Sequence, residues 1–387
     1  MATALINGRV LLEDSFGFGK AVLVEGDRIA AIVAEGDVPV GAARIDLGGA
    51  MLLPGFIDTQ VNGGGGVLFN DAPTVEGIAA IGAAHRRFGT TGFLPTLISD
   101  ELAKVEQAMA AADAAMAGGV PGVLGIHVEG PFLDPGRNGI HDRSKIRRID
   151  ESAIELLSRK GKGRTLVTLA PEHVRPQEIR ALADAGVIVA AGHTDATART
   201  IFTALDHGLS GFTHLFNAMS PLGNREPGVV GAALFDDRGW CGIIVDGRHV
   251  HPVVLQIALR STRASRFMLV TDAMPTVGAA EKSFNLQGRR IVVKDCVCVD
   301  EKGTLAGSDL DMASAVRNAV NLLGLSLREA VDMASRNPAE FLGLGHELGR
   351  IAPGYRADLV LADDDLNILE TWIGGAPSQV EPMRAYG

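Results

Sequence analysis

The sequence predicts an α/β fold: a (β/α)8 TIM-like barrel with a small β-sandwich domain formed by both chain termini. Short apolar strand candidates recur through the central part of the chain, and Ala- and Leu-rich segments with helical spacing separate most of them. Both ends of the chain instead carry β-rich runs divided by turn residues. Eight strands that alternate with helices are the number a barrel of this kind requires. The strand candidates end near Gln60, Pro95, Glu129, Ala170, His193, His214, Asp246 and Asp272.

The two termini are expected to build one small domain together. Residues 1–52 read as hairpin strands, and a strand texture returns after residue 348 in the run Gly349-Arg350-Ile351-Ala352-Pro353-Gly354 and beyond. We therefore predict a domain made of residues 1–52 plus 348–387, attached to a barrel formed by residues 53–347.

Helices are predicted at Val75–Phe88, Leu102–Ala117 and Gln177–Ala185, where apolar residues recur at helical spacing. After Asp272 the pattern changes to a β-rich excursion that extends from Phe284 to Ser308. Further helices are expected at about 311–323, 326–335 and 338–342.

Composition and charge restrict the classes of partner. The chain has 387 residues, 47% of them hydrophobic, and a formal net charge of −10, which argues against nucleic acid or an anionic membrane as the main partner. The first residues lack the charged start and apolar run of a signal peptide, and no apolar run is long enough to cross a bilayer. Its three cysteines, Cys241, Cys296 and Cys298, show no disulfide spacing. We therefore expect a reduced, cytoplasmic protein.

Four residues capable of metal or acid–base chemistry fall at the predicted strand ends: Glu129, His193, His214 and Asp272. In a barrel these ends meet at one rim. Two neutral imidazoles and a carboxylate bind a catalytic divalent ion and leave a position for water. Zinc suits this set best, although iron, cobalt and manganese accept the same ligands. Asp272 is then the candidate general base and acid.

The first barrel strand departs from a common metal-binding pattern. Many metal-dependent hydrolases end this strand in His-x-His, but here Gln60 and Asn62 follow Asp58. Amides bind zinc poorly, so we expect Gln60 and Asn62 to line the site without holding an ion, and we expect one metal per subunit. His127 lies two residues before Glu129 and so faces the same way; it either packs in the core or supports the metal site.

A second group of residues, in loops that follow strand ends, forms a candidate substrate-binding site. Arg225 and His249 can hold a phosphate, and backbone N–H groups near Asn217 and Ala218 can add to it. Arg225 is equally well explained as a solvated loop charge.

Several motifs together carry a family resemblance. They are His127-Val128-Glu129-Gly130-Pro131-Phe132, Gly192-His193-Thr194, Thr213-His214-Leu215-Phe216-Asn217-Ala218-Met219, Thr271-Asp272-Ala273 and Leu305-Ala306-Gly307-Ser308. With Pro54-Gly55-Phe56-Ile57-Asp58 in front, the whole chain resembles the amidohydrolase superfamily, and within it the N-acetylglucosamine-6-phosphate deacetylases.

The resemblance implies roles for individual residues. It implies one metal ion held by Glu129, His193 and His214, with Asp272 as the catalytic acid and base. It also implies a homodimer in which Arg225 reaches the phosphate across the interface, while Arg248 stands where this family has an apolar residue. The implied substrate contacts are His141 and its neighbour Ile140 at the sugar or acyl oxygen, His249 and Asn217-Ala218 at the phosphate, and Leu305, Ala306 and Gly307 around the acetyl group.

The expected reaction is hydrolysis of the acetamide of N-acetylglucosamine 6-phosphate, with N-acetylgalactosamine 6-phosphate or another acylated amino-sugar phosphate as the alternative substrate. Two other readings differ in class. One is an amidohydrolase acting on a nucleobase or hydantoin ring, although these normally keep the first His pair. The other is a barrel that has lost catalysis, which a measurement of metal content would identify.

Overall fold

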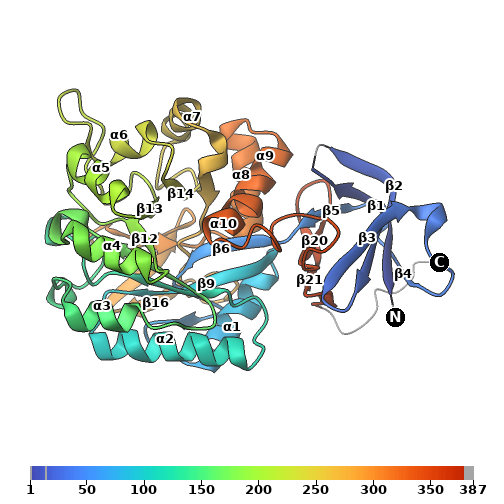
Figure 1. Cartoon of the computed structure of the whole chain (residues 1–387), viewed down its shortest axis with the longest axis horizontal. Coiled ribbons are helices and arrows are strands. Elements are labelled where there is room, and N and C mark those ends of the chain that lie inside the picture. The colour runs from blue at the N-terminus through green and yellow to red at the C-terminus, as the bar shows by residue number, and fades with distance from the viewer. Residues whose placement is uncertain (1, 14, 379–387) are drawn as a thin grey trace.

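The computed structural model describes residues 2–13 and 15–378, and it confirms the predicted fold class. Figure 1 shows a barrel surrounded by helices beside a smaller part built from strands, in which the first and last strands of the chain lie together. None of the helices in the described part of the chain combines the length and apolar character that crossing a bilayer demands.

The barrel consists of parallel strands whose order in space follows their order in the sequence. The first and last strands meet after β15, where the N–H of Asp272 donates to the Gln60 carbonyl at 3.1 Å and the N–H of Asn62 donates to the Ala273 carbonyl at 2.9 Å. This seam brings together residues about two hundred positions apart. The strands are β6 (Phe56–Val61), β9 (Thr90–Ile98), β10 (Gly125–Glu129), β11 (Arg164–Leu169), β12 (Ile188–Ala191), β13 (Leu209–Phe212), β14 (Trp240–Ile243) and β15 (Phe267–Leu269).

The helices pack around the barrel, as Figure 1 shows. All six predicted helices are present with ends shifted by a few residues: α1 (Val75–Arg86), α2 (Leu102–Ala117), α4 (Pro176–Asp184), α8 (Met312–Leu323), α9 (Leu327–Ala334) and α10 (Arg336–Phe341). Four more were not assigned from the sequence: α3 (Glu151–Leu157), α5 (Ala198–Asp206), α6 (Gly228–Phe235) and α7 (Pro252–Ser261). The sequence of α6, Gly-Val-Val-Gly-Ala-Ala-Leu-Phe, has no polar face, so it lacks the period that marks a helix.

The smaller part is a mainly antiparallel sheet with the order β22-β21-β20-β5-β1-β2-β3 and β4 beside β1. Alternate residues of its strands point to opposite faces, so Leu5 and Val22 join one apolar cluster, and Ala4 and Leu23 join another. Its strands are β1 (Thr3–Leu11), β2 (Phe16–Glu25), β3 (Arg28–Ala34), β4 (Ala43–Asp46), β5 (Met51–Pro54), β20 (Leu359–Ala362), β21 (Ile368–Ile373) and β22 (Ala376–Pro377).

Strand β5 leads directly into barrel strand β6 through Gly55. A Cβ atom at Gly55 would lie 2.0 Å from the Thr91 hydroxyl, so only glycine fits this close passage. The sheet of the two termini is thereby joined to the start of the barrel without a linker.

An antiparallel sheet covers one side of the barrel mouth. Its inner face, which includes Leu286, Ile291 and Cys298, packs on Ile140 and Met274. The sheet therefore brings the segment after Thr304 to the rim where the functional residues lie. Its strands are β16 (Ser283–Leu286), β17 (Arg289–Lys294), β18 (Val297–Val299) and β19 (Leu305–Ser308), and a separate small hairpin is formed by β7 (Gly63–Gly64) and β8 (Val67–Leu68).

Candidate active site

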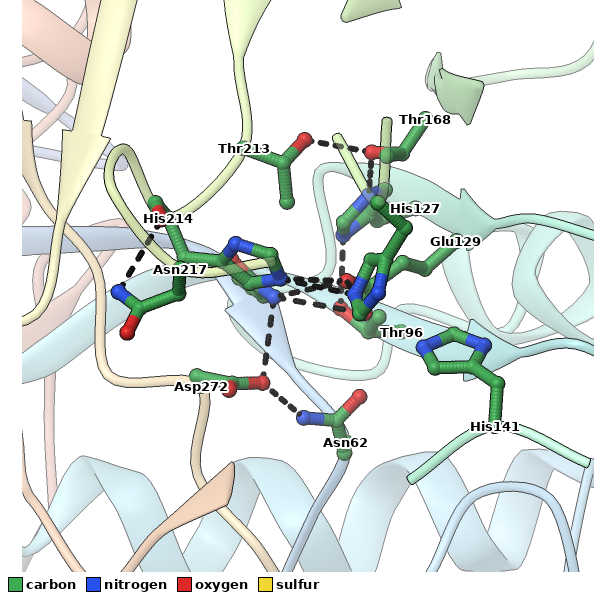
Figure 2. Close-up of polar contacts among 12 residues, drawn as sticks. Asn62, Thr96, His127, Glu129, His141, Thr168, Thr213, His214, Asn217 and Asp272 are labelled. Carbon is green, nitrogen blue, oxygen red and sulfur yellow. Dashed lines mark hydrogen bonds and ion pairs between the residues drawn. The ribbon is translucent and has the colours of Figure 1, made fainter. Parts of the chain in front are cut away.

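Glu129, His193 and His214 converge at the carboxyl-terminal rim of the barrel, and Figure 2 labels Glu129 and His214 at this place. Glu129 is the last residue of β10, and each histidine lies two residues beyond its strand, β12 or β13. Glu129 Oε1 lies 3.1 Å from His193 Nε2 and 3.0 Å from His214 Nε2, and the two imidazole nitrogens are themselves 3.0 Å apart. Both histidines have positive φ angles, 49° and 33°, a conformation that side chains other than glycine seldom adopt and that recurs at functional sites.

The chemistry of these three groups fits a divalent cation. His193 Nδ1 donates to the Arg137 carbonyl at 2.9 Å, which leaves the Nε2 lone pair directed at the cluster. Burial acts to raise the pKa of Glu129, but the hydrogen bonds and charges of His193 and His214 outweigh it and hold that pKa well below its usual range. An ionised carboxylate and imidazole nitrogens at this spacing are ligands that a zinc-like ion prefers.

Two amides occupy the side of the cluster where a first-strand His pair would stand. Gln60 Nε2 lies 3.4 Å from both oxygens of Glu129 and donates to Asp272 Oδ1 at 3.1 Å. Asn62 Nδ2 donates to the same Asp272 oxygen at 2.6 Å. These N–H groups point at the carboxylates of Glu129 and Asp272. Gln60 and Asn62 therefore line the site as hydrogen-bond donors, and the number of metal ions stays a prediction.

Asp272 lies beyond β15 with a φ angle of 51°. Its Oδ1 atom is held by the two amides, and no hydrogen bond to Oδ2 occurs among the described residues. Burial, followed by the nearby charge of Glu129, raises the pKa of Asp272. A carboxylate with a raised pKa and a free oxygen suits proton transfer.

A cavity of about 360 Å³ opens above this cluster. His141 lines it and packs against His193, with ring centroids 4.4 Å apart and the rings tilted by 58°. His141 Nδ1 accepts the Ser99 N–H at 3.2 Å, so the proton of the neutral ring resides on Nε2. Burial, then the neighbouring His193, lowers the pKa of His141 to about 3. His141 is therefore a neutral hydrogen-bond donor at physiological pH.

The other side of the cavity carries His249. Its Nδ1 contacts Asp246 Oδ2 at 2.6 Å, and its own N–H and that of Arg248 bind Asp246 Oδ1. Burial acts to raise the pKa of Asp246, yet the His249 contact and these backbone bonds lower it overall. Asp246 thus fixes the orientation of His249. Arg248 itself turns outward, 3.7 Å from Asp295 at the end of the β17–β18 hairpin.

Comparison with known proteins decides the family. The model of the Amidohydrolase family matches residues 51–380, most of the chain. The chain belongs to the amidohydrolase family. It is 47% identical over 324 residues to the N-acetylgalactosamine-6-phosphate deacetylase of Shewanella sp. (strain ANA-3), and this match covers 84% of this chain and 82% of that protein.

Solved structures agree. The N-acetylglucosamine-6-phosphate deacetylase of Pasteurella multocida is 36% identical with a TM-score of 0.94, and the match covers 97% of this chain and 99% of that one. A mutant of the enzyme from Mycobacterium smegmatis, solved in complex with N-acetyl-D-glucosamine-6-phosphate, is 33% identical with a TM-score of 0.88 over the same shares. This chain is accordingly a hydrolase that acts on an amide, and its family is metal-dependent.

Most of the predicted site residues of this amidohydrolase line the cavity above the cluster of Glu129, His193 and His214, and a few do not. Ala306 is fully buried and does not line the cavity, because successive residues of β19 face opposite ways and Leu305 and Gly307 face the cavity. Its place in an acetyl pocket stays a prediction. Gln60 lies beneath the cavity, against the two carboxylates. Arg225 is exposed in the loop before α6 and does not line the cavity. The predicted residues that do line the cavity are Asn62, Glu129, Ile140, His141, His193, His214, Asn217, Ala218, His249, Asp272, Leu305 and Gly307.

The Asn217-Ala218 backbone offers less than predicted. The Asn217 N–H already donates to the His214 carbonyl at 3.0 Å, so it is not available to a ligand. The Ala218 N–H has no backbone acceptor in the described part of the chain, and its φ of 50° belongs to the tight turn that follows His214. Of the pair, Ala218 is therefore the donor that a phosphate could use.

Residues absent from the predicted site hold the His193 turn. Glu172 accepts the Thr194 hydroxyl at 2.5 Å and the Asp195 N–H at 2.6 Å, while the Asp134 N–H donates to the His193 carbonyl at 2.9 Å. Asp134, Glu172 and His173 lie close enough to resemble a second metal cluster. The carboxylate oxygens of Asp134 and Glu172 already accept hydrogen bonds from the protein, so these residues hold the backbone of the turn in place. Their sequence neighbours carry no pattern that would have revealed this role.

Proposed function

We propose that this amidohydrolase hydrolyses the acetamide of N-acetylglucosamine 6-phosphate to glucosamine 6-phosphate and acetate. The observation that carries the proposal is the convergence of two imidazoles and two carboxylates beneath a cavity large enough for a sugar phosphate. The similar proteins from Pasteurella and Mycobacterium are N-acetylglucosamine-6-phosphate deacetylases, which supports this substrate.

The proposed cofactor is one divalent ion per subunit, held by Glu129, His193 and His214. Zinc suits these ligands best, with iron, cobalt or manganese as substitutes. When bound, such an ion polarises a carbonyl and lowers the pKa of water. Gln60 and Asn62 keep Asp272 and Glu129 in place with N–H donors, and they supply no ligand of their own.

Asp272 moves the protons. Its free Oδ2 takes the proton of the attacking water, and the same carboxyl group returns it to the amine nitrogen as the C–N bond breaks. The raised pKa of Asp272 brings the group closer to the neutral range in which it can both accept and donate.

His141 stabilises the charge that develops on the acyl oxygen. Its Nε2–H is the remaining donor of a ring whose Nδ1 is occupied by Ser99. Because burial keeps the ring neutral, His141 donates a hydrogen bond without giving up its proton.

The phosphate is proposed to lie near His249, the Ala218 N–H and the partner subunit's Arg225. A homodimer is supported by an apolar surface around α6 and α7, where Leu222, Phe235, Val253 and Ile257 expose 62%, 83%, 53% and 57% of their area. Leu222 and Arg225 share the loop before α6. Contiguous exposed apolar surface is typical of interaction sites. Substituting Arg225 with alanine should weaken binding of the phosphorylated sugar and leave the dimer intact.

N-acetylgalactosamine 6-phosphate is the second candidate substrate. The Shewanella relative, at 47% identity, bears that function in its name. The two sugars differ only in the orientation of one hydroxyl group, so the same metal site and phosphate grip serve both. We place the enzyme in the cytoplasm, in keeping with its three free cysteines, Cys241, Cys296 and Cys298.

The test is acetate release by the metal-loaded protein from three compounds in parallel: N-acetylglucosamine 6-phosphate, its galacto epimer and unphosphorylated N-acetylglucosamine. Rapid turnover of the first and slow turnover of the last support both the substrate and the phosphate grip. Turnover of the galacto epimer alone would transfer the function to the second candidate. No acetate from any of the three, with one metal bound per chain, would refute the substrate class.

A further inference from the structure

A layer of buried polar side chains lies directly beneath the metal ligands. It consists of Thr96 on β9, His127 on β10, Thr168 on β11 and Thr213 just after β13, and hereafter it is called the polar layer. Their exposed fractions are 0%, 1%, 0% and 7%. Barrel interiors are normally filled by branched apolar side chains. Buried polar groups are costly unless paired, so this departure calls for a reason other than packing.

Hydrogen bonds join the four residues into one chain across the barrel (Figure 2). Thr213 and Thr168 hydroxyls are 2.6 Å apart, Thr168 Oγ1 lies 2.7 Å from His127 Nε2, and His127 Nδ1 lies 3.2 Å from Thr96 Oγ1. Thr96 Oγ1 in turn accepts the Val61 N–H of the first strand at 2.9 Å. The chain therefore ties β6, β9, β10 and β11 to the turn after β13.

The direction of the chain follows from donor accounting. If Thr213 donates to Thr168, Thr168 to His127 and His127 to Thr96, the last hydroxyl can donate to the Leu94 carbonyl at 3.4 Å, and every proton has an acceptor. In the opposite direction the Thr213 proton has no acceptor among the described residues. The layer is thus fully paired in one arrangement only, which fixes the ring of His127.

Two members of the polar layer, His127 and Thr213, are close neighbours of a metal ligand in the sequence, and Thr168 lies opposite Glu129 in the strand register. His127 lies two residues before Glu129 on the same strand face, and Thr213 directly precedes His214. Gly192 directly precedes His193, and a Cβ atom there would lie 2.6 Å from Thr168 Cγ2 and 3.0 Å from Thr213 Cβ. Glycine at this position therefore lets the two threonines meet beneath β12.

From this geometry we infer that the polar layer positions Glu129, His193 and His214 for metal binding, with Thr168 as its central positioning residue. The inference rests on the metal site of the proposed function. Thr168 makes both the link to Thr213 and the link to His127. A methyl group in place of its hydroxyl cannot remain 2.7 Å from His127 Nε2, so the ring and the adjacent strand must move. Residues that orient metal ligands in this way typically change affinity by about 10- to 100-fold when lost.

The test compares Thr168→Val with Thr168→Ser, which keeps the hydroxyl, and with Thr165→Val. The last variant makes the same chemical change on the outward face of β11, beside the cavity between α2 and α3. Zinc affinity of the metal-stripped proteins is measured by calorimetry, alongside the thermal unfolding of the metal-free forms. We expect Thr168→Val to bind zinc at least about tenfold more weakly, while Thr168→Ser and Thr165→Val stay within about threefold of the wild type.

Equal zinc affinity in Thr168→Val and Thr165→Val would overturn the inference, because the layer would then only fill space. Should Thr168→Val fail to fold, Thr213→Val removes a single link and is read in the same way. A wild type that binds no zinc overturns the inference as well. Zinc affinity is measured without a sugar. A wild type that binds zinc but releases no acetate would therefore refute the proposed substrate, while the zinc affinities of the variants would still test the role of the polar layer.

Discussion

Replacing Asp272 with asparagine isolates the proton-transfer step. Gln60 Nε2 and Asn62 Nδ2 donate to Asp272 Oδ1 at 3.1 and 2.6 Å, and an asparagine carbonyl oxygen accepts both bonds in the same place. The substitution therefore keeps the position of the side chain and changes only Oδ2, which becomes an amide nitrogen that cannot take a proton.

The expected loss follows from that single change. Positioned acid–base groups contribute about 10²- to 10⁴-fold to a rate, which corresponds to about 3–5 kcal/mol of activation free energy. Burial disfavours the ionised form of Asp272 and raises its pKa, so a neutral asparagine at this position should not lower the melting temperature. The metal content should stay at the wild-type value, since Glu129, His193 and His214 are unchanged.

The assay measures kcat by acetate release, with bound metal determined by elemental analysis on the same samples. Asp184→Asn is the matched control, because it makes the same change at an exposed position at the end of α4. A kcat within threefold of the wild type would refute the role of Asp272. A loss of activity together with the loss of bound metal would also refute it, because Asp272 would then act as a ligand.

Three further outcomes are expected. Removing metal with a chelator should abolish acetate release and lower the melting temperature, and added zinc should restore both; unchanged activity after complete stripping would contradict the metal site. Asp246→Asn removes the charge that orients His249, so the KM for the phosphorylated sugar should rise about tenfold with little change in kcat; an unchanged KM would separate His249 from the phosphate. Burial raises the pKa of Asp58 from 3.8 to about 7, so the folded chain retains a proton that the unfolded chain releases, and the wild type loses about 4 kcal/mol of stability from this group as pH rises from about 4 to 7. The Asp58→Asn variant has no such group to titrate, so its free energy of unfolding by urea, relative to that of the wild type, should increase between about pH 4 and 7. Equal pH dependence of the two proteins would contradict a buried, protonated Asp58.

Local patterns in the sequence predicted a large part of this protein. Alternation of apolar strands with helical segments gave the barrel, since each strand and helix is marked by its own period. Short helices without a hydrophobic periodicity were not predicted, and α6 is the clearest case, because its residues are apolar on every side. Glu129, His193, His214 and Asp272 were identified because barrel strands all end at one rim, so position along the strand predicts position in space.

The tertiary structure alone decided how these residues are held. The seam between β6 and β15 sets Gln60 and Asn62 against Asp272, a contact across about 210 residues that no local pattern encodes. The Arg137 carbonyl fixes the tautomer of His193, and Thr168 meets Thr213 over a glycine. Threonines in a buried strand look like ordinary β-branched residues until their partners are known.

The sequence by itself determined the candidate ligand residues, the barrel and the absence of a first-strand His pair, because each depends on residue identity and local spacing. Only the tertiary structure decided that Ala306 faces away from the cavity, that the Asn217 N–H is already bonded and that Arg225 does not line the cavity. The physical reason is that hydrogen-bond partners and facing directions depend on how distant segments pack. That packing follows from closing the whole barrel.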